Sequence, residues 1–537
     1  MTIKFCIFAV KYYSIKKFFK QCVIDNFLSN NLLSSNNILL QKIKHLKAKH
    51  IIVIGGGFAG MSAAAYLAKN GYSVTLLEKN STLGGRCRLL EKDGFRFDLG
   101  PSWYWMPDVF EKFYNDFHHT TGDFYENTLL NPGFEIVFDN KEKISVPDQT
   151  NDLYKLFESI EPGSSEKLKA FMKEAEIKYK IAMEEIVYKP FISVRELLDK
   201  RLIYNLPKLS VFTSMSQHIR KYFKDEKLIK LMEFPVIFLG GMPKDIPALY
   251  SLMNYAAFEL GTWYPQGGMY EVVKAIEKIL REHNVNIRTE EEVIKLEIKN
   301  NSIKSVVTNK TEYSCDAVVA AADYHFVDRH LLGNEYANYS EKYWNKRFLA
   351  PSALLFYIGV NKKIPALSHH TLFFDADFEQ HSKDIYENPK WPENPLFYLS
   401  CTSKTDKTVA PEGHENLVSL IPVASGLNDN PEKEEYYFKN ILNRIYQYTG
   451  MDISNNIVFK KSYTVSDFTK DYYSFKGNAY GLANTLLQTA TLKPSMLNKK
   501  VKNLVYAGQL TVPGPGVPPS LISGKIAANL VQQKLKI

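Results

Sequence analysis

Three glycines have the clearest chemical potential in the sequence, because Gly55, Gly57 and Gly60 form the pattern GxGxxG. The pattern follows the apolar, β-branched run at 51–54 and precedes small residues at helical spacing. Gly55 permits a tight turn, Gly57 lets the backbone approach a pyrophosphate, and Gly60 lets a helix pack against the strand. The helix N-terminus then offers free N–H groups and partial positive charge to phosphates. This spacing predicts a dinucleotide site.

An acidic residue supports this interpretation over a glycine-rich turn without a ligand. Glu78 ends the next apolar run, eighteen residues after Gly60. A carboxylate in that place can accept hydrogen bonds from the hydroxyls of a ribose. The helix between the two runs is expected to end at Gly71, which gives a strand–helix–strand unit over residues 51–80.

A second turn indicates which dinucleotide binds. Gly84–Gly85–Arg86 supplies accessible backbone and a guanidinium directly after the second strand. Arg86 can bind the pyrophosphate or an edge of a flavin. A nicotinamide site has no need of this element, so it favours a flavin, with a basic surface turn as the alternative. The bend at Asp98 is expected to be structural.

The C-terminal segment offers a third element of a flavin site. A strand brings Gly508–Gln509 to the sheet edge, and Gly514 and Gly516 allow a close approach to a ligand. Pro518–Pro519 suit the first turn of a final helix. The N-terminus of that helix would stabilise negative charge on a reduced flavin. A simple terminal helix is the alternative.

The order of elements predicts the fold class. Residues 116–264 are expected to be mostly helical, whereas 267–325 return to strands and a helix that end in a buried strand near 318–321. We therefore predict an α/β protein with a doubly wound, Rossmann-like FAD-binding domain and an inserted α+β substrate domain. The FAD-binding domain is assigned to residues 49–115, 265–330 and 490–537. The substrate domain is assigned to residues 116–264 and 331–489.

Composition narrows the function. The chain has 537 residues, 45% of them hydrophobic, which predicts more than one domain. Residues 1–50 hold nine lysines and one acidic residue, so the remainder is nearly neutral and nucleic acid is not expected as a partner. The five cysteines lie far apart, without a CxxC pair or histidine cluster, so no disulfides and no metal site are expected. No apolar run approaches the ~20 residues of a transmembrane helix.

The Lys- and Asn-rich segment at 1–48 differs from the rest of the chain. Three interpretations stay open for it: a dispensable extension, an organelle-targeting segment, or a basic anchor for anionic lipid.

From about residue 51 to 535 the chain resembles the flavin amine-oxidase superfamily and, within it, the bacterial-type phytoene desaturases. The resemblance rests on VIGGGFAGMSAAAYLAKNGYSVTLLEKNSTLGGR, GFRFDLGPS, WYPQGGMYEVVKAIEKIL, the AAAD at 320–323 and GPGVPPSLISGKIAANL. It implies an FAD-dependent oxidoreductase that introduces double bonds into phytoene or a related acyclic carotenoid, towards lycopene. Alternatives on the same fold are a carotenoid isomerase and an amine oxidase.

The resemblance also implies roles for particular residues. Arg195 and Glu196 match a polar pair in the substrate domain, and Glu196 is the candidate base, with a solvated helix face as the alternative. His369–His370 matches a family position and is expected to be structural. The expected cofactor-binding residues are Gly55, Gly57, Phe58, Ala59, Gly60, Glu78, Lys79, Gly84, Gly85, Arg86, Val293, Gly508, Gln509 and Val517.

The implied substrate has further consequences. A long hydrocarbon binds through apolar burial and reaches the enzyme from a bilayer, so a cytoplasmic protein that associates peripherally with a membrane is expected. Organelle targeting by residues 1–48 stays open. Quinone or oxygen is expected to reoxidise the flavin.

Overall fold

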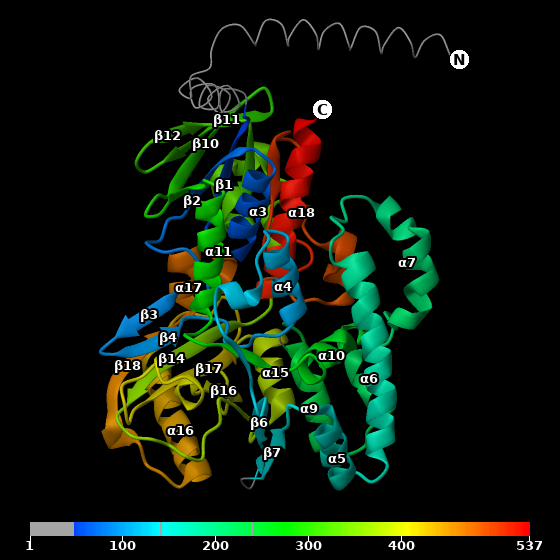
Figure 1. The fold of residues 1–537 in the computed structure, drawn as a ribbon, viewed down its shortest axis with the longest axis vertical. Coiled ribbons are helices and arrows are strands. Elements are labelled where there is room, and N and C mark those ends of the chain that lie inside the picture. The colour runs from blue at the N-terminus through cyan, green and yellow to red at the C-terminus, as the bar shows by residue number, and fades with distance from the viewer. Residues whose placement is uncertain (1–47, 140–141, 238–239, 537) are drawn as a thin grey trace, which may run out of the picture. The chain divides into compact units, whose positions relative to one another are not determined.

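A computed structural model describes residues 48–139, 142–237 and 240–536 of the chain. The basic segment predicted at 1–48 therefore lies outside the described residues, apart from Ala48. The described residues from His50 onward pack as one unit, whose helices and strands are drawn in Figure 1.

A five-stranded sheet forms the part of the molecule that holds the glycine motifs. All its pairings are parallel, in the order β19-β13-β1-β2-β9. Strand β1 is buried from Ile51 to Ile54, as a parallel strand covered on both faces must be. The strands come from three distant stretches of the chain: β1 (His50–Ile54), β2 (Ser73–Leu77), β9 (Asn286–Arg288), β13 (Ala317–Ala320) and β19 (Leu504–Tyr506). The predicted doubly wound fold is confirmed.

Helices α3 (Phe58–Lys69) and α18 (Val517–Leu535) pack on this sheet, and α11 (Tyr270–Glu282) packs against α3. Helix α3 joins β1 to β2, as predicted, and lies against α18, the red helix in Figure 1. The crossing of α3 and α18 is close, because a Cβ atom on Gly524 would lie 2.3 Å from the carbonyl oxygen of Ala59. Ser62 Oγ donates a hydrogen bond to the Leu521 carbonyl across the same contact, at 2.7 Å.

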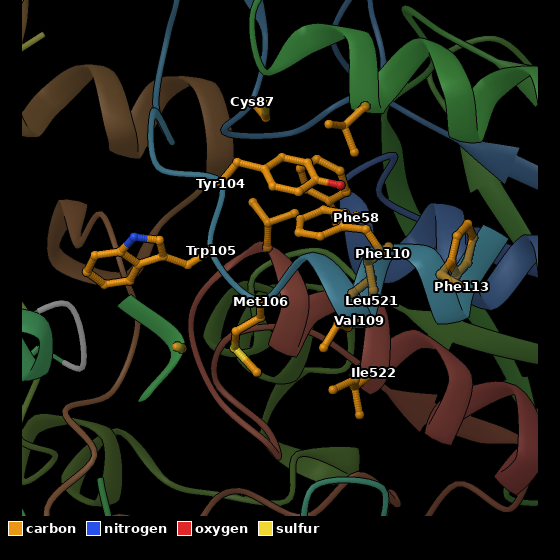
Figure 2. Close-up of a cluster of buried hydrophobic side chains, with 14 of the residues drawn as sticks. Phe58, Cys87, Tyr104, Trp105, Met106, Val109, Phe110, Phe113, Leu521 and Ile522 are labelled. Atoms are coloured by element: carbon orange, nitrogen blue, oxygen red, sulfur yellow. The ribbon is translucent and has the colours of Figure 1, made fainter. Parts of the chain in front are cut away.

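Helix α4 (Pro107–Asn115) fixes the start of α3 to the start of α18. Figure 2 shows Phe58 among side chains that come from α4 and α18. The rings of Tyr104 and Phe110 stack with centroids 4.2 Å apart, and Leu521 and Ile522 belong to the same cluster. This cluster is buried, so it stabilises the approach of both helix N-termini to the sheet edge.

A second sheet of seven strands has the order β18-β14-β17-β16-β15-β6-β7. Only the β15–β6 pairing among these is parallel. Its strands are β6 (Phe134–Val137), β7 (Lys143–Val146), β14 (Ser352–Val360), β15 (His370–Phe373), β16 (Phe397–Ser400), β17 (Glu415–Val423) and β18 (Ile457–Tyr463). Because β6 and β7 share this sheet with β14–β18, we propose that the segments 116–264 and 331–489 form one substrate domain.

The segment predicted to be mostly helical is only partly so. Strands β5, β6 and β7 precede its helices: β6 pairs with β15, far along the chain, and the β-branched run of β7 at 143–146 pairs with β6. The helices that follow are α5 (Thr150–Ile160), α6 (Ser164–Ile181), α7 (Lys200–Asn205), α8 (Met215–Ile219), α9 (Glu226–Ile237) and α10 (Leu252–Phe258).

The remaining elements are short. An antiparallel meander of β10 (Val293–Lys299), β11 (Ser302–Thr308) and β12 (Glu312–Ser314) precedes β13, as predicted. The other strands are β3 (Leu89–Lys92), β4 (Phe95–Asp98), β5 (Asn127–Leu129) and β8 (Trp263–Pro265). The other α-helices are α12 (Tyr324–Phe326), α13 (Gly333–Tyr336), α14 (Glu341–Asn345), α15 (Phe378–Tyr386), α16 (Pro431–Thr449) and α17 (Val465–Tyr472).

Two absences hold for the described residues. None of their helices combines the length and apolar character that crossing a bilayer requires. Within the same ranges no group of acidic, histidine or cysteine side chains is arranged to hold a metal ion.

The crossing of α3 and α18 yields a stability prediction. Gly524→Ala should lower the free energy of unfolding by about 1–3 kcal/mol, because the added methyl group meets a backbone carbonyl that cannot rotate away. Thermal denaturation measures the loss. Gln533→Ala, on the exposed side of the same helix, is the control and should change the free energy by less than ~0.5 kcal/mol. Unchanged stability of Gly524→Ala would contradict the close crossing.

Candidate active site

A large cavity opens where the parallel strands end at their C-terminal edge. It encloses about 1540 Å³, including space open to solvent. This is the edge at which doubly wound sheets bind ligands. The predicted cofactor-binding residues that line it are Gly55, Gly57, Phe58, Ala59, Glu78, Lys79, Gly84, Gly85, Arg86, Val293, Gly508, Gln509 and Val517.

Gly60 is the predicted residue that does not line the cavity. A Cβ atom there would lie 1.9 Å from the Gly55 carbonyl oxygen, so a glycine is needed at this position for the helix to pack against the turn. Gly55 has φ +100°, which favours glycine. Gly57 and Gly85 face each other so closely that a Cβ on Gly85 would lie 3.0 Å from the Gly57 Cα. The two glycine turns thus form a narrow cradle of bare backbone.

Glu78 lies at the end of β2, with 5% of its surface exposed. Its Oε2 accepts a hydrogen bond from the Gly56 N–H at 2.7 Å, and its Oε1 accepts one from the Asn80 N–H at 2.8 Å. The carboxylate therefore stabilises the glycine turn. Oε1 also accepts from Asn80 Nδ2 at 2.8 Å, so the second lone pair of Oε2 is the one that can receive a ribose hydroxyl.

Arg86 connects three distant parts of the chain. Its Nη1 donates to Gln509 Oε1 at 3.1 Å, and its Nη2 donates to Ser474 Oγ at 3.1 Å and to the Asn478 carbonyl at 3.2 Å. Its buried Nε has no hydrogen-bond partner among the described residues. A buried donor without a partner is costly, so this atom fits an acceptor on a bound cofactor.

One wall of the cavity was missing from the sequence prediction. It comes from the segment 471–480, which had been assigned to the substrate domain, and includes Asp471, Tyr472, Tyr473, Ala479 and Tyr480. The Lys79 ammonium lies 3.8 Å from the centre of the Tyr473 ring. The tyrosines that lie near Gly477 and Gly481 could have indicated this wall. Their spacing, however, does not show which strands they contact.

Asp98, which is half-buried, and Asp323, which is buried, are acids near this edge. Asp98 accepts from the N–H groups of Met269 and Tyr270 at the start of α11, which confirms its predicted structural role. Burial raises the pKa of Asp98 to about 6. Asp323 lines the cavity and accepts from the Phe326 N–H at 3.2 Å, and burial raises the pKa of its carboxyl as well.

A second cavity of about 1640 Å³ adjoins the first. The residues that line both cavities are Gly100, Pro101, Leu420, Tyr480, Gly516 and Val517. Its other walls are mainly apolar and aromatic, with Trp103, Trp105, Phe234, Phe374 and Phe378 among them. No described residue that lines this cavity carries a carboxylate or an ammonium group.

The predicted catalytic pair lies elsewhere. Arg195 and Glu196 belong to the short 3₁₀-helix Val194–Leu198 and line neither cavity. The Glu196 carboxylate accepts from the N–H groups of Phe191 and Ser193, each at 3.0 Å. Its contacts are those of a helix cap, and they give no support to the catalytic role predicted for the pair. His369 and His370 are buried behind the wall of the second cavity.

Lys493 is buried without a hydrogen-bond partner among the described residues. A Cβ on Gly514, in the loop before α18, would lie 3.4 Å from its Nζ. Burial lowers the pKa of Lys493 to about 7. Because the unfolded chain keeps a pKa near 10.5, it binds more protons than the folded chain between pH 7 and 10.5, so this residue makes stability rise with pH across that window.

Lys493→Met should therefore stabilise the protein at pH 7, by about 2–5 kcal/mol, because it removes a buried charge that has no partner. This stabilisation by the variant should decrease steadily as the pH rises towards 10. Denaturant unfolding at several pH values measures it. If the difference in free energy of unfolding between Lys493→Met and wild type does not change with pH, the charged form of Lys493 is not destabilised by burial.

Comparison with known proteins agrees with this geometry. Residues 58–532 match the family described as flavin containing amine oxidoreductase. A carotenoid 3,4-desaturase from Haloarcula japonica is 40% identical over 90% of this chain and 98% of its own length. A zeta-carotene-forming phytoene desaturase from Myxococcus xanthus is 28% identical over 90% and 94%. A 4,4'-diapophytoene desaturase from Staphylococcus haemolyticus is 30% identical over 90% and 99%.

Solved structures share the fold at low identity. A putrescine oxidase variant has a TM-score of 0.60 at 13% identity and covers 91% of this chain and 99% of its own. A fatty acid isomerase from P. acnes has a TM-score of 0.57 at 14% identity over 90% and 98%. The chain thus belongs to the flavin containing amine oxidoreductase family, within it to the carotenoid desaturases, and it is an FAD-dependent oxidoreductase.

Proposed function

We propose that the chain introduces conjugated double bonds into an acyclic carotenoid, phytoene or a close relative. The observation that carries this proposal is the apolar second cavity, which shares a wall with the cofactor cavity. A hydrocarbon in it would lie beside a cofactor bound at the sheet edge. Its binding energy would come from burial, at roughly 25 cal/mol per Å² of apolar surface.

The charge of the cavity argues against the amine-oxidase alternative. An ammonium substrate buried in an apolar cavity needs a carboxylate partner, because an unpaired charge is costly to bury. The described residues of the second cavity offer aromatic rings but no acid. The aromatic rings lie beside methionines and prolines, such as Met106, Met242 and Pro519. This lining favours a long, uncharged hydrocarbon as substrate.

FAD, when bound, accepts the hydride that leaves the substrate. The residues of the chain would hold it in place: the two glycine turns for the pyrophosphate, Glu78 for the ribose and Arg86 for an acceptor at its Nε. Gly516 and Val517 place the N-terminus of α18 between the two cavities. Partial positive charge at this end of the helix stabilises negative charge nearby.

A second candidate substrate is an already conjugated carotenoid that is desaturated near its end. The identity of 40% to the carotenoid 3,4-desaturase, against 28% to the phytoene desaturase, favours it. Both candidates need the same apolar cavity and the same hydride transfer.

An exposed apolar surface supports peripheral membrane association. In the segment 192–212 the exposed fraction is 85% for Phe212, 74% for Tyr204 and 66% for Leu198. The positively charged side chains Arg195, Lys200, Arg201 and Lys208 lie in the same segment. Apolar side chains beside lysine and arginine are typical of surfaces that bind anionic lipid.

The function is tested by incubating the FAD-loaded protein with liposomes that contain phytoene and with quinone or air as acceptor. New absorption bands at longer wavelength and new pigments on chromatography are expected. An already conjugated carotenoid is assayed in parallel for the second candidate. Isomer shifts without added double bonds would indicate an isomerase, and hydrogen peroxide formed from amines would indicate an oxidase. Unchanged carotenoids with a folded, FAD-loaded protein would contradict the proposal.

Glu78→Ala should weaken FAD binding by about 5- to 150-fold, which corresponds to roughly 1–3 kcal/mol. The variant loses both the ribose acceptor and the hydrogen bond to Gly56. Flavin content after gel filtration and titration of the apoprotein measure the loss. Glu297→Ala, in β10, should bind FAD like wild type. Equal retention by Glu78→Ala and wild type would refute the role of Glu78.

Replacing Tyr204 and Phe212 together by glutamate should reduce binding to anionic liposomes at least ~10-fold, because two apolar anchors and their burial are lost. Sedimentation with liposomes measures this, while flavin content should not change. The matched control replaces Tyr436 and Tyr446, exposed tyrosines of α16, by glutamate. If both double variants bind liposomes like wild type, the segment 192–212 does not contact the membrane.

A further inference from the structure

The second cavity has few polar groups that can act in proton transfer. The described polar side chains in its lining are Ser102, His381, Ser382, Tyr386, Tyr398 and Tyr480. Since forming a double bond releases a proton as well as a hydride, one group must receive that proton. No acid is available among these residues, so the hydroxyls and the histidine are the candidates.

His381 is excluded by its hydrogen bonds. Its Nδ1 accepts from the Leu396 N–H at 3.0 Å, and its Nε2 lies 2.8 Å from the Pro422 carbonyl. A backbone N–H can only donate and a carbonyl can only accept, so the ring is a neutral tautomer with its proton on Nε2. Its one lone pair is already used, and this histidine has no free site for a proton.

Tyr398 is connected to a base. Its hydroxyl lies 2.9 Å from Ser102 Oγ and 2.6 Å from His370 Nδ1. Ser102 and Tyr398 line the cavity, whereas His370 is fully buried behind them at the start of β15. Two hydroxyls at the wall thus lead to an imidazole. Ser102 follows Gly100 and Pro101, which line both cavities, so this group lies where the cavities meet.

The surroundings of His370 keep its imidazole neutral, so one ring nitrogen carries a lone pair that can accept a proton. The Trp103 indole stacks on its ring with centroids 4.1 Å apart and planes 11° apart, and His369 lies on another side at 4.4 Å. Burial, together with His369, holds the pKa of His370 well below 6.5. Its Nε2 has no hydrogen-bond partner in the described part of the chain. The face of an aromatic ring stabilises an adjacent cation, so Trp103 would stabilise a protonated His370.

We propose that Tyr398 is the catalytic residue that receives the proton of the substrate, and that His370 is a positioning residue that takes the proton of the tyrosine. The inference rests on the proposed desaturation. The hydride leaves one carbon for FAD, and the C–H bond of the adjacent carbon breaks. Its electron pair forms the new π bond, its proton goes to Tyr398 Oη, and the original O–H proton of the tyrosine moves to His370 Nδ1. The proton passes to solvent afterwards.

A weak base suffices for this step. The carbon that has lost a hydride is cationic, so the C–H bond beside it is strongly acidic. A phenol hydrogen-bonded to a neutral imidazole can therefore do what a carboxylate does for a weaker acid. A neutral base also avoids the cost of burying a negative charge in an apolar cavity.

Tyr398→Phe tests the proposal in the FAD-loaded protein. Without oxygen, phytoene in liposomes should reduce the bound flavin about 10²- to 10⁴-fold more slowly than in wild type. Flavin content should equal that of wild type, and the phytoene concentration at half-maximal rate should change less than about threefold, because the ring remains. Tyr437→Phe is the control, since Tyr437 is a buried tyrosine that donates to the Pro392 carbonyl and lines neither cavity.

A second readout separates proton transfer from a structural role. Flavin reduction in wild type should be slower in D₂O, because exchangeable protons move between Tyr398 and His370. The solvent effect should vanish in Tyr398→Phe and in His370→Gln. The second variant removes the proton acceptor behind Tyr398 without changing the residues that line the cavity. A Tyr398→Phe variant that reduces flavin at the wild-type rate, or that keeps the solvent effect, overturns this inference alone. A wild-type flavin that phytoene does not reduce overturns the proposed function together with it.

Discussion

The structure depends on a close approach of backbone to backbone at the C-terminal edge of the parallel sheet. Gly60 lets α3 begin directly against the Gly55 carbonyl, and Gly524 lets α18 cross α3 at the same edge. Any larger side chain at these points would push a helix away from the edge. The two helix N-termini then both face the cavity, where their N–H groups and partial positive charges favour a pyrophosphate and an anionic ring system.

The rest of the site follows from that constraint. Glu78 holds the first glycine turn, while Arg86 connects the second turn to residues more than 380 positions later in the chain. Because Gly516 and Val517 line both cavities, the helix that completes the cofactor cavity also forms a wall of the apolar one. In the proposed function, a hydrocarbon would thus be held beside the cofactor by packing alone, without an ion pair to orient it. Orientation must come from the shape of the aromatic lining, and proton transfer must use neutral groups.

The sequence allowed the cofactor cavity to be predicted in detail, because local rules determine it. A glycine pattern after a strand, an acid at the end of the next strand and a glycine before a helix each have one dominant structural meaning. The wall at 471–480 could not be predicted, since it reaches the cavity through long-range packing. Strand β6 was missed for the same reason, as its partner β15 lies far along the chain, and β7 was missed with it because β7 pairs with β6. The polar pair Arg195–Glu196 was predicted to be catalytic, but the structure shows that the Glu196 carboxylate caps a short helix. His370 was noted for its position, yet only the fold shows that Tyr398 and Ser102 connect it to the cavity.

The most direct test of the account is a structure of the protein with FAD and a carotenoid bound, determined by crystallography or electron microscopy. The account predicts FAD along the glycine turns at Gly57 and Gly85, with the polyene in the apolar cavity between Trp103 and Phe378 and its reacting bond beside the Tyr398 hydroxyl. A carotenoid bound outside the second cavity, or FAD bound away from the ends of β1 and β2, would contradict it.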